Sequence, residues 1–400
     1  MPVPTRRTLL AGAAVLTAGA AAAQERAPEP IEGNRGASIL GPLYRPRAAE
    51  NPDILQPPST DHGALPNLRF SFADAHVKMR EGGWSREVTK RELPVATTIA
   101  GVNMRLTAGG VRELHWHKEA EWSFVLAGNV RITAVDTDGH NFIADVKAGD
   151  LWYFPPGIPH SIQGLQPDGG EFLLAFPEGG FSEDSTFAIT DMFAHMPKTA
   201  LAKNLQIDAS ALASIPKEER FIFQAPVPPP LETDAVRSPQ GGVPQSMKFS
   251  LMELSPESAP GGRVRIADTK NFPISAQIAV AHVEVDPGHM REVHWHPNAD
   301  EWQFYISGRA RMTVFGAEAR ARTFDYQAGD VGYVPMSMSH FIENTGNEPL
   351  RFLELFRAPR FEDVSLAQWM ALTPHELVAQ HLNIDVAVLD RLRASKKPLV

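Results

Sequence analysis

The 400-residue chain contains no cysteine, so disulfide bonds and thiolate metal ligands are both excluded. Basic residues are not in excess. The formal net charge is −9 and no basic stripe occurs, which argues against nucleic-acid binding. Its most apolar stretch, residues 11–23, is too short and too rich in Ala and Gly to span a membrane. A hydrophobic content of 43% is typical of a globular protein with enough chain for two sizeable cores.

The first 23 residues have the form of a cleavable export signal. Arg6 and Arg7 precede the apolar run, which ends in small residues at Ala21 and Ala23. Paired arginines predict a twin-arginine signal, and therefore a protein that is exported after folding to the periplasm or the medium. Residues 24–65 are rich in Pro, Gly and Asn and predict an extended arm.

Two similar segments make up the rest of the chain. Residues 66–224 and 247–400 contain short apolar-alternating runs broken by Gly, Pro and Asp, which predict two all-β units. Each unit ends in apolar residues at helical spacing, in the first case over residues 198–219. The Pro- and Gly-rich stretch 225–246 predicts a linker between the units.

The two units are internal copies of one another. His115 matches His294 at an offset of 179, and Glu121 matches Glu301 at an offset of 180. His160 matches His340 at the same offset of 180. The tails also match: residues 204–208 read Asn-Leu-Gln-Ile-Asp and residues 381–385 read His-Leu-Asn-Ile-Asp.

Each copy carries the ligands of a divalent metal ion. His115 and His117 are two residues apart, so in a strand both rings point to one face, and Trp116 points to the other. Glu121 adds a carboxylate and His160 arrives from a distant segment. Three imidazoles and one carboxylate leave open positions on an octahedral ion, and they also accept iron, cobalt, nickel or zinc. The second set consists of His294, His296, Glu301 and His340.

The spacing of these residues resembles the two motifs of the cupin superfamily. The first copy departs from the motif at Gly164, where Asn is usual, and the second at Ser337, where Gly is usual. Beyond the motifs, the whole chain after the signal resembles the bicupin oxalate decarboxylases. This resemblance implies an all-β fold of two cupin barrels, each followed by short helices. It also implies two manganese ions per chain, oxalate as substrate, dioxygen as a cofactor that is not consumed, formate and carbon dioxide as products, and a homohexamer.

An arginine lies three residues before each His-Trp-His. Arg112 and Arg291 could each hold a carboxylate through paired hydrogen bonds. The resemblance places the first-site proton donor on Glu183, in a lid whose family motif is Ser-Glu-Asn-Ser. Here Asp184 replaces the Asn, and we expect its charge to raise the pKa of Glu183.

The second unit lacks this lid motif. At an offset of 180, residues 362–365 align with the lid residues 182–185 and read Glu-Asp-Val-Ser. The resemblance assigns the second-site glutamate to Glu354, whose first-unit counterpart is Leu174. A strand-end ion pair with Arg351 or Arg357 is an equally good interpretation of Glu354. We therefore expect the first site to carry most of the turnover, because only it has a lid that could exclude water.

Two other functions fit the metal ligands. An oxalate oxidase would use the same ligands and substrate but release hydrogen peroxide. The Glu183 lid argues against it, because an oxidase has no carbon to protonate. A periplasmic manganese-storage protein would keep both ligand sets, yet it would need neither the lid nor the two arginines.

Overall fold

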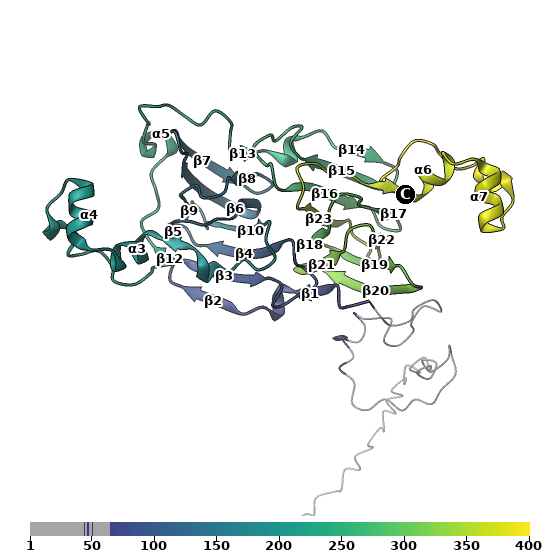
Figure 1. Ribbon diagram of the computed structural model, residues 1–400, viewed down its shortest axis with the longest axis horizontal. Coiled ribbons are helices and arrows are strands. Elements are labelled where there is room, and N and C mark those ends of the chain that lie inside the picture. The colour runs from purple at the N-terminus through teal and green to yellow at the C-terminus, as the bar shows by residue number, and fades with distance from the viewer. Residues whose placement is uncertain (1–43, 45, 48–49, 51–64) are drawn as a thin grey trace, which may run out of the picture.

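The computed structural model describes residues 44, 46–47, 50 and 65–400. The predicted signal (1–23) and nearly all of the predicted arm (24–65) lie outside these residues. Two β-barrels lie side by side, and their helical tails project at opposite ends of the molecule (Figure 1). The expected all-β architecture with short helices is therefore confirmed. Within the described part of the chain, no helix is long and apolar enough to cross a bilayer.

The first barrel is built from antiparallel strands around the long strand β6, which belongs to both of its faces. The first half of β6 pairs with β8 and β10, and the second half pairs with β7 and β9. The strands of this barrel are β2 (Val77–Arg80), β3 (Gly83–Val88), β4 (Ala100–Leu106), β5 (Gly110–Trp116), β6 (Glu121–Val135), β7 (Asn141–Lys147), β8 (Leu151–Phe154), β9 (His160–Gly164), β10 (Gly170–Phe176), β11 (Phe187–Ala188) and β12 (Ile222–Gln224).

The second barrel repeats this order with two exceptions. The equivalent of β6 is divided into two strands at Gly308, whose φ is 89°, and β12 is replaced by a single bridge between Arg291 and Leu399. Its strands are β14 (Glu257–Ala259), β15 (Gly262–Ala267), β16 (Ala279–Val285), β17 (Met290–Trp295), β18 (Glu301–Ser307), β19 (Arg309–Gly316), β20 (Arg320–Gln327), β21 (Asp330–Val334), β22 (Ser339–Asn344), β23 (Leu350–Phe356) and β24 (Val364–Ser365).

The two units exchange short strands. Strand β1 (Arg69–Ser71) precedes the first barrel but pairs with β21 of the second, where Arg69 donates to buried Asp330 at 2.6 Å. Strand β13 (Lys248–Phe249) precedes the second barrel but pairs with β8 of the first. Each predicted unit thus contributes a strand to its neighbour, and the boundaries drawn from the sequence remain a proposal.

A shared apolar core joins the barrels. It combines residues that are 180 positions apart, such as Trp122 with Trp302 and Tyr153 with Tyr333, all of them at most 1% exposed. Equivalent faces of the two copies therefore pack against each other. Burial on this scale makes the interface resemble a domain interior more than a contact between separate proteins.

The helical tails also correspond, at an offset of 177. Helix α4 (Lys198–Leu205) is capped by Gln206, and α7 (His375–Leu382) is capped by Asn383. Both cap residues adopt the left-handed conformation. The helix expected over residues 198–219 is therefore too long, because the left-handed residue ends it after two turns. The remaining helices are α3 (Ile189–His195), α5 (Leu231–Asp234) in the predicted linker, α6 (Leu366–Ala371) and α8 (Val386–Leu389), with 3-10 turns at Phe72–Asp74, Glu183–Ser185, Ala209–Leu212 and Leu251–Glu253.

Candidate metal centres and substrate site

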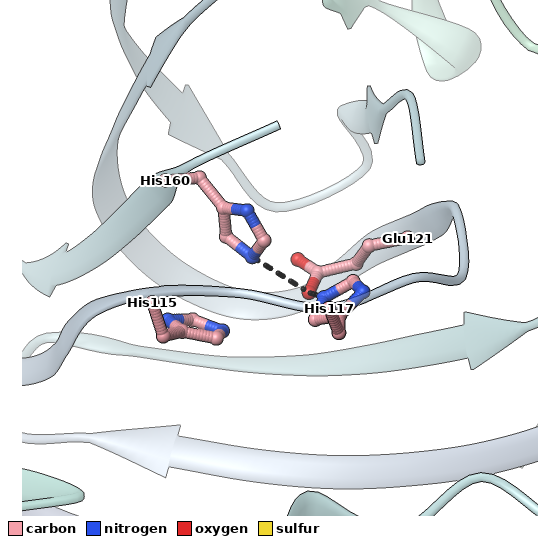
Figure 2. Close-up of side chains that lie close together, drawn as sticks. All are labelled: His115, His117, Glu121 and His160. Atoms are coloured by element: carbon pink, nitrogen blue, oxygen red, sulfur yellow. Dashed lines mark hydrogen bonds and ion pairs between the residues drawn. The ribbon is translucent and has the colours of Figure 1, made fainter. Parts of the chain in front are cut away.

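The four predicted ligands of the first site converge inside the first barrel. Strand β5 supplies His115, and His117 follows directly after it; Glu121 begins β6 and His160 begins β9. Figure 2 shows the carboxylate of Glu121 pointing toward the ring of His160, and their Oε2 and Nε2 atoms are 3.3 Å apart. All four ligand atoms lie within 4.8 Å of one another, and every one of these side chains is buried.

Backbone carbonyl groups orient the three imidazoles. The Nδ1 atoms of His115, His117 and His160 lie 2.6–2.8 Å from carbonyl oxygens and can donate to them. This leaves each Nε2 atom directed toward the common centre, as in metal-ligating histidines. Burial, followed by the charge of Arg112, keeps the pKa of His115 well below its usual value, so this ring is neutral and able to ligate.

The second set has the same geometry. His294, His296, Glu301 and His340 lie within 4.8 Å of one another, all buried. The Oε2 atom of Glu301 is 3.0 Å from His296 Nε2 and 2.8 Å from His340 Nε2. Buried ligand atoms at both centres have no hydrogen-bond partner: His160 Nε2, His294 Nε2, His296 Nε2, Glu301 Oε2 and His340 Nε2.

Unpaired buried polar atoms are costly unless a ligand satisfies them. Five such atoms directed at two compact centres fit a pair of divalent cations. The predicted metal sites are therefore brought together in full, residue by residue. A hard carboxylate combined with neutral imidazoles suits manganese and other first-row metals alike.

Each ligand glutamate is also held by a buried donor, which sequence reasoning missed. Trp152 donates from Nε1 to Glu121 Oε1 at 2.9 Å. In the second unit Gly332 stands at the position of Trp152, and Gln303 donates to Glu301 Oε1 at 2.7 Å instead. A Cβ on Gly332 would lie 2.4 Å from Gln303 Oε1, so the small residue creates the space for this different donor.

Arg112 lies buried beside the first metal centre. Its Nη2 donates to Thr186 Oγ1 at 2.9 Å, and its Nη1 donates to the carbonyl of Phe221 at 3.4 Å. Its Nε lies 3.2 Å from Glu183 Oε2, but neither of these two atoms has a hydrogen-bond partner of good geometry. Of these three contacts only the one with Glu183 involves a charged group, and it is poorly aligned, so a substrate carboxylate would compete with weak contacts at Arg112.

Glu183 enters the site from the lid. The side chain of Ser182 accepts a hydrogen bond from the backbone N–H of Asp184 and so begins the 3-10 turn that carries Glu183. The Glu183 side chain is 5% exposed and points at Arg112. Burial raises the pKa of Glu183 despite the opposing charge of Arg112. A carboxyl that holds its proton to a higher pH is suited to act as an acid.

Asp184 does not produce this shift in the way expected. It points away from the site with its side chain 72% exposed, and it accepts from Lys78 Nζ at 2.7 Å. The hydrogen bond from Lys78 lowers the pKa of Asp184. Burial, rather than Asp184, is thus the main reason for the raised pKa of Glu183, since a paired and exposed carboxylate exerts little force on a neighbour.

The arginine of the second site has different partners. Arg291 Nε donates to Glu354 Oε1 at 3.2 Å, Nη2 donates to Asp363 Oδ2 at 2.6 Å, and Nη1 donates to the carbonyl of Pro398 at 3.2 Å. Glu354 therefore lies at the second site in a buried ion pair with Arg291, and not in the strand-end pair considered as the alternative, since Arg351 pairs with Glu284 instead. Burial raises the pKa of Glu354 as well.

Strand register corrects the alignment of the lids. Ala188 pairs with His115 and Ser365 pairs with His294, which is an offset of 177. The offset of 180 that was applied to residues 182–185 is therefore wrong. By Ala188 the offset has fallen to 177, so the second unit is three residues shorter in this segment (180 − 177). In the corrected register Asp363 matches Thr186, and both side chains bind Nη2 of the local arginine.

The two tryptophans of the His-Trp-His motifs point away from the metal centres. Trp116 stacks on Phe187 with ring centroids 5.5 Å apart, and Trp295 meets Trp369 edge to face at 5.6 Å. Phe187 and Trp369 are 55% and 57% exposed.

Comparisons with known proteins agree with this geometry. The cupin family model matches residues 71–212 and 251–389. The chain is 51% identical to the oxalate decarboxylase OxdC of Bacillus subtilis, over 94% of this chain and 98% of that protein. It is 38% identical to a probable oxalate decarboxylase of Arthroderma benhamiae, with 93% of each chain covered.

Solved structures of the Bacillus subtilis enzyme superpose closely. A serine-to-alanine mutant gives a TM-score of 0.90 at 51% identity, covering 93% of this chain and 99% of that one. A second structure, determined in a study of the Mn(II) centres of that enzyme, gives the same TM-score with 94% and 99% covered. The chain belongs to the cupin family and, within it, to the oxalate decarboxylases.

Proposed function

We propose that the chain is a manganese-dependent oxalate decarboxylase that converts oxalate to formate and carbon dioxide, with dioxygen as a cofactor that is not consumed. The observation that carries this proposal is the buried pair of Arg112 Nε and Glu183 Oε2, 3.2 Å apart and unsatisfied, beside the first ligand set. The resemblance to named oxalate decarboxylases over nearly the whole chain supports it.

The first ligand set would hold manganese through His115, His117, Glu121 and His160. When bound, the ion would supply Lewis-acid and redox chemistry next to the substrate. Arg112 would bind one oxalate carboxylate through charge-assisted hydrogen bonds and hold it in place as charge redistributes during cleavage of the C–C bond.

Loss of carbon dioxide leaves a carbon that must be protonated to give formate. Glu183 is the acid placed to deliver that proton, because its carboxyl is buried beside Arg112 and its pKa is raised. The closed lid would also exclude water, which would otherwise compete at the reacting centre.

A cavity beside the lid offers a route for the substrate. It has a volume of about 540 Å3, and its lining includes Lys90, Lys118, Phe181 and Ser182. Glu119 and Glu178 also line it and balance the charges of the two lysines, so the cavity offers polar contacts along the route rather than a net positive charge. Movement of the lid would then connect this cavity with Arg112.

The test is to measure formate and hydrogen peroxide released by the manganese-loaded protein, together with its Glu183→Ala variant. We expect formate as the main product of the natural protein. The variant should lose about 10²–10⁴-fold in formate release, the usual contribution of a general acid, while retaining its manganese. Peroxide as the main product would favour the oxalate oxidase, and metal binding without turnover would favour the storage protein.

We further propose that residues 1–23 export the protein by the twin-arginine route and that it assembles as a homo-oligomer, a hexamer by family resemblance. Paired Arg6 and Arg7 before an apolar run support export. Exposed apolar residues on the projecting tails, including Leu205 and Leu377, support assembly. Cell fractionation of an Arg6→Lys/Arg7→Lys variant and light scattering of the purified protein test these two points.

A further inference from the structure

Each of the three guanidinium nitrogens of Arg291 donates a hydrogen bond to another group of the same chain. The Nε, Nη1 and Nη2 atoms donate to Glu354, to the carbonyl of Pro398 and to Asp363, respectively. At the first site Arg112 Nε lies 3.2 Å from Glu183 Oε2 without a well-aligned hydrogen bond, and Nη2 is bound by the neutral hydroxyl of Thr186 rather than by a carboxylate. The two arginines, equivalent in sequence, therefore differ in their ability to accept an additional carboxylate.

The difference depends on one pair of positions. Asp363 occupies the register of Thr186, so that a carboxylate replaces a hydroxyl opposite Nη2. A hydroxyl is neutral, and it can rotate to serve other partners. A carboxylate at 2.6 Å makes the same charge-assisted contact that a substrate carboxylate would make, and a substrate would have to displace it.

A second cation holds Asp363 from the other side. Lys396, on the C-terminal segment, forms an ion pair with Asp363, whose side chain is 2% exposed. Burial lowers the pKa of Lys396 to about 8, which leaves its ammonium charged at neutral pH. The equivalent residue at the first site, 177 positions earlier, is Glu219, of opposite charge. The first site thus offers no cation at the position that fixes Asp363 in the second.

We propose that Asp363, held by Lys396, is a built-in carboxylate that occupies Arg291 and prevents oxalate from binding at the second site. A cavity of about 450 Å3 lies directly beside it, lined by Lys270, Arg291 and Lys396 and also by the carboxylates Glu257, Asp268, Glu362 and Asp363. The cavity is large enough for a small dicarboxylate, but Arg291 and Lys396 are both already paired with Asp363. This inference rests on the proposed function, because it assigns oxalate binding to the first site alone.

Oxalate binding to manganese-loaded protein tests the proposal. Isothermal titration calorimetry would use the Glu183→Ala variant as the host, in which turnover is blocked and binding can be measured. We expect one oxalate per chain in this host, and two per chain when Asp363→Ala is added. Manganese content, measured in parallel, should stay at two ions per chain in both proteins.

A matched control comes from the buried pair of Arg69 and Asp330, whose Nη2–Oδ2 distance is also 2.6 Å but which does not line the cavity. Adding Asp330→Ala to the host should leave one oxalate per chain. A third variant, Lys396→Met, keeps Asp363 but removes the cation that holds it. It should admit a second oxalate at least tenfold more weakly than Asp363→Ala does, and it covers the case in which Asp363→Ala does not fold.

Two results would overturn the proposal. The first is two oxalates bound per chain by the host itself. The second is no additional oxalate bound by both the Asp363→Ala and the Lys396→Met proteins while each retains two manganese ions. Failure of the proposed function is a separate result. In that case the natural protein would release no formate, whereas the difference of one binding site between the host and its Asp363→Ala derivative would still be measured.

Discussion

The two metal sites of this chain share their ligands but not the surroundings of their arginines. Both sets of three histidines and one glutamate lie within 4.8 Å, on equivalent strands. Around the arginines, a lid glutamate and a hydroxyl at the first site are replaced by a strand glutamate and an aspartate at the second. The metal ligands are preserved between the copies, whereas the groups around them have diverged both on strands, as at Leu174 and Glu354, and in the lid, as at Thr186 and Asp363.

Removing one ligand from each site is the most severe test of this comparison. His160→Ala and His340→Ala should each reduce manganese from two ions to one per chain. The first change should lower formate release at least as much as loss of the proton donor does, by about 10²–10⁴-fold, and the second should leave most of the turnover. Metal analysis and a formate assay on both variants check this. Equal losses of turnover would show that the second site is needed for catalysis.

Residues 177–180, with Gly179 and Gly180, precede the lid and are expected to act as its hinge, and changes there should have an intermediate effect confined to the first site. A Cβ on Gly179 would lie 2.2 Å from the carbonyl oxygen of Ala96, whereas a Cβ on Gly180 meets the flexible end of Lys90 at 2.8 Å. Gly179→Ala should therefore strain the closed lid by about 1–3 kcal/mol and lower kcat for formate roughly tenfold or more. Gly180→Ala is the control and should change kcat little. Similar kcat values for both variants would contradict the hinge.

The smallest expected effect concerns the acid itself. Glu87 accepts from the backbone N–H of Glu183 at 3.2 Å, and its charge contributes to the raised pKa of that residue. Ionised Glu183 cannot donate a proton, so turnover should fall as pH rises through its pKa. Glu87→Gln removes a negative neighbour, lowers that pKa and should move the decline to lower pH by less than about one unit.

Asp184→Asn is the matched comparison for Glu87→Gln. Because Asp184 is exposed and paired with Lys78, its substitution should leave the alkaline limb of the pH–rate profile in place. The measurement is kcat against pH for the natural protein and both variants. A larger shift in Asp184→Asn than in Glu87→Gln would restore the interpretation made from the sequence.

Most of the metal chemistry could be predicted from the sequence, because residues two apart in a strand must share a face and the repeat showed the pattern twice. His115, His117, Glu121 and His160 meet as the spacing requires. The donors Trp152 and Gln303 could not be foreseen, because they occupy different strands in the two copies and look like ordinary core residues in sequence.

The surroundings of the arginines were only partly predictable. The matched tails, Asn204–Asp208 and His381–Asp385, already lie at an offset of 177, so a three-residue deletion between the ligands and the tails was visible in the sequence. The sequence did not show that this deletion lies in the lid, because only the strand pairing of Ala188 and Ser365 fixes the register of that segment. That deletion brings Asp363, rather than a lid acid, to the second arginine.

The exchanged strands have a consequence for synthesis of the chain. Arg69 is translated 261 residues before its ion-pair partner Asp330, and the first unit also awaits Lys248 and Phe249 to complete β8's pairing. Each barrel thus lacks one strand contact until the other has been synthesised, and we expect these last contacts of both barrels to form late. The chain should mature as one cooperative body, so that any cellular process that accepts only the folded form would accept both metal sites or neither.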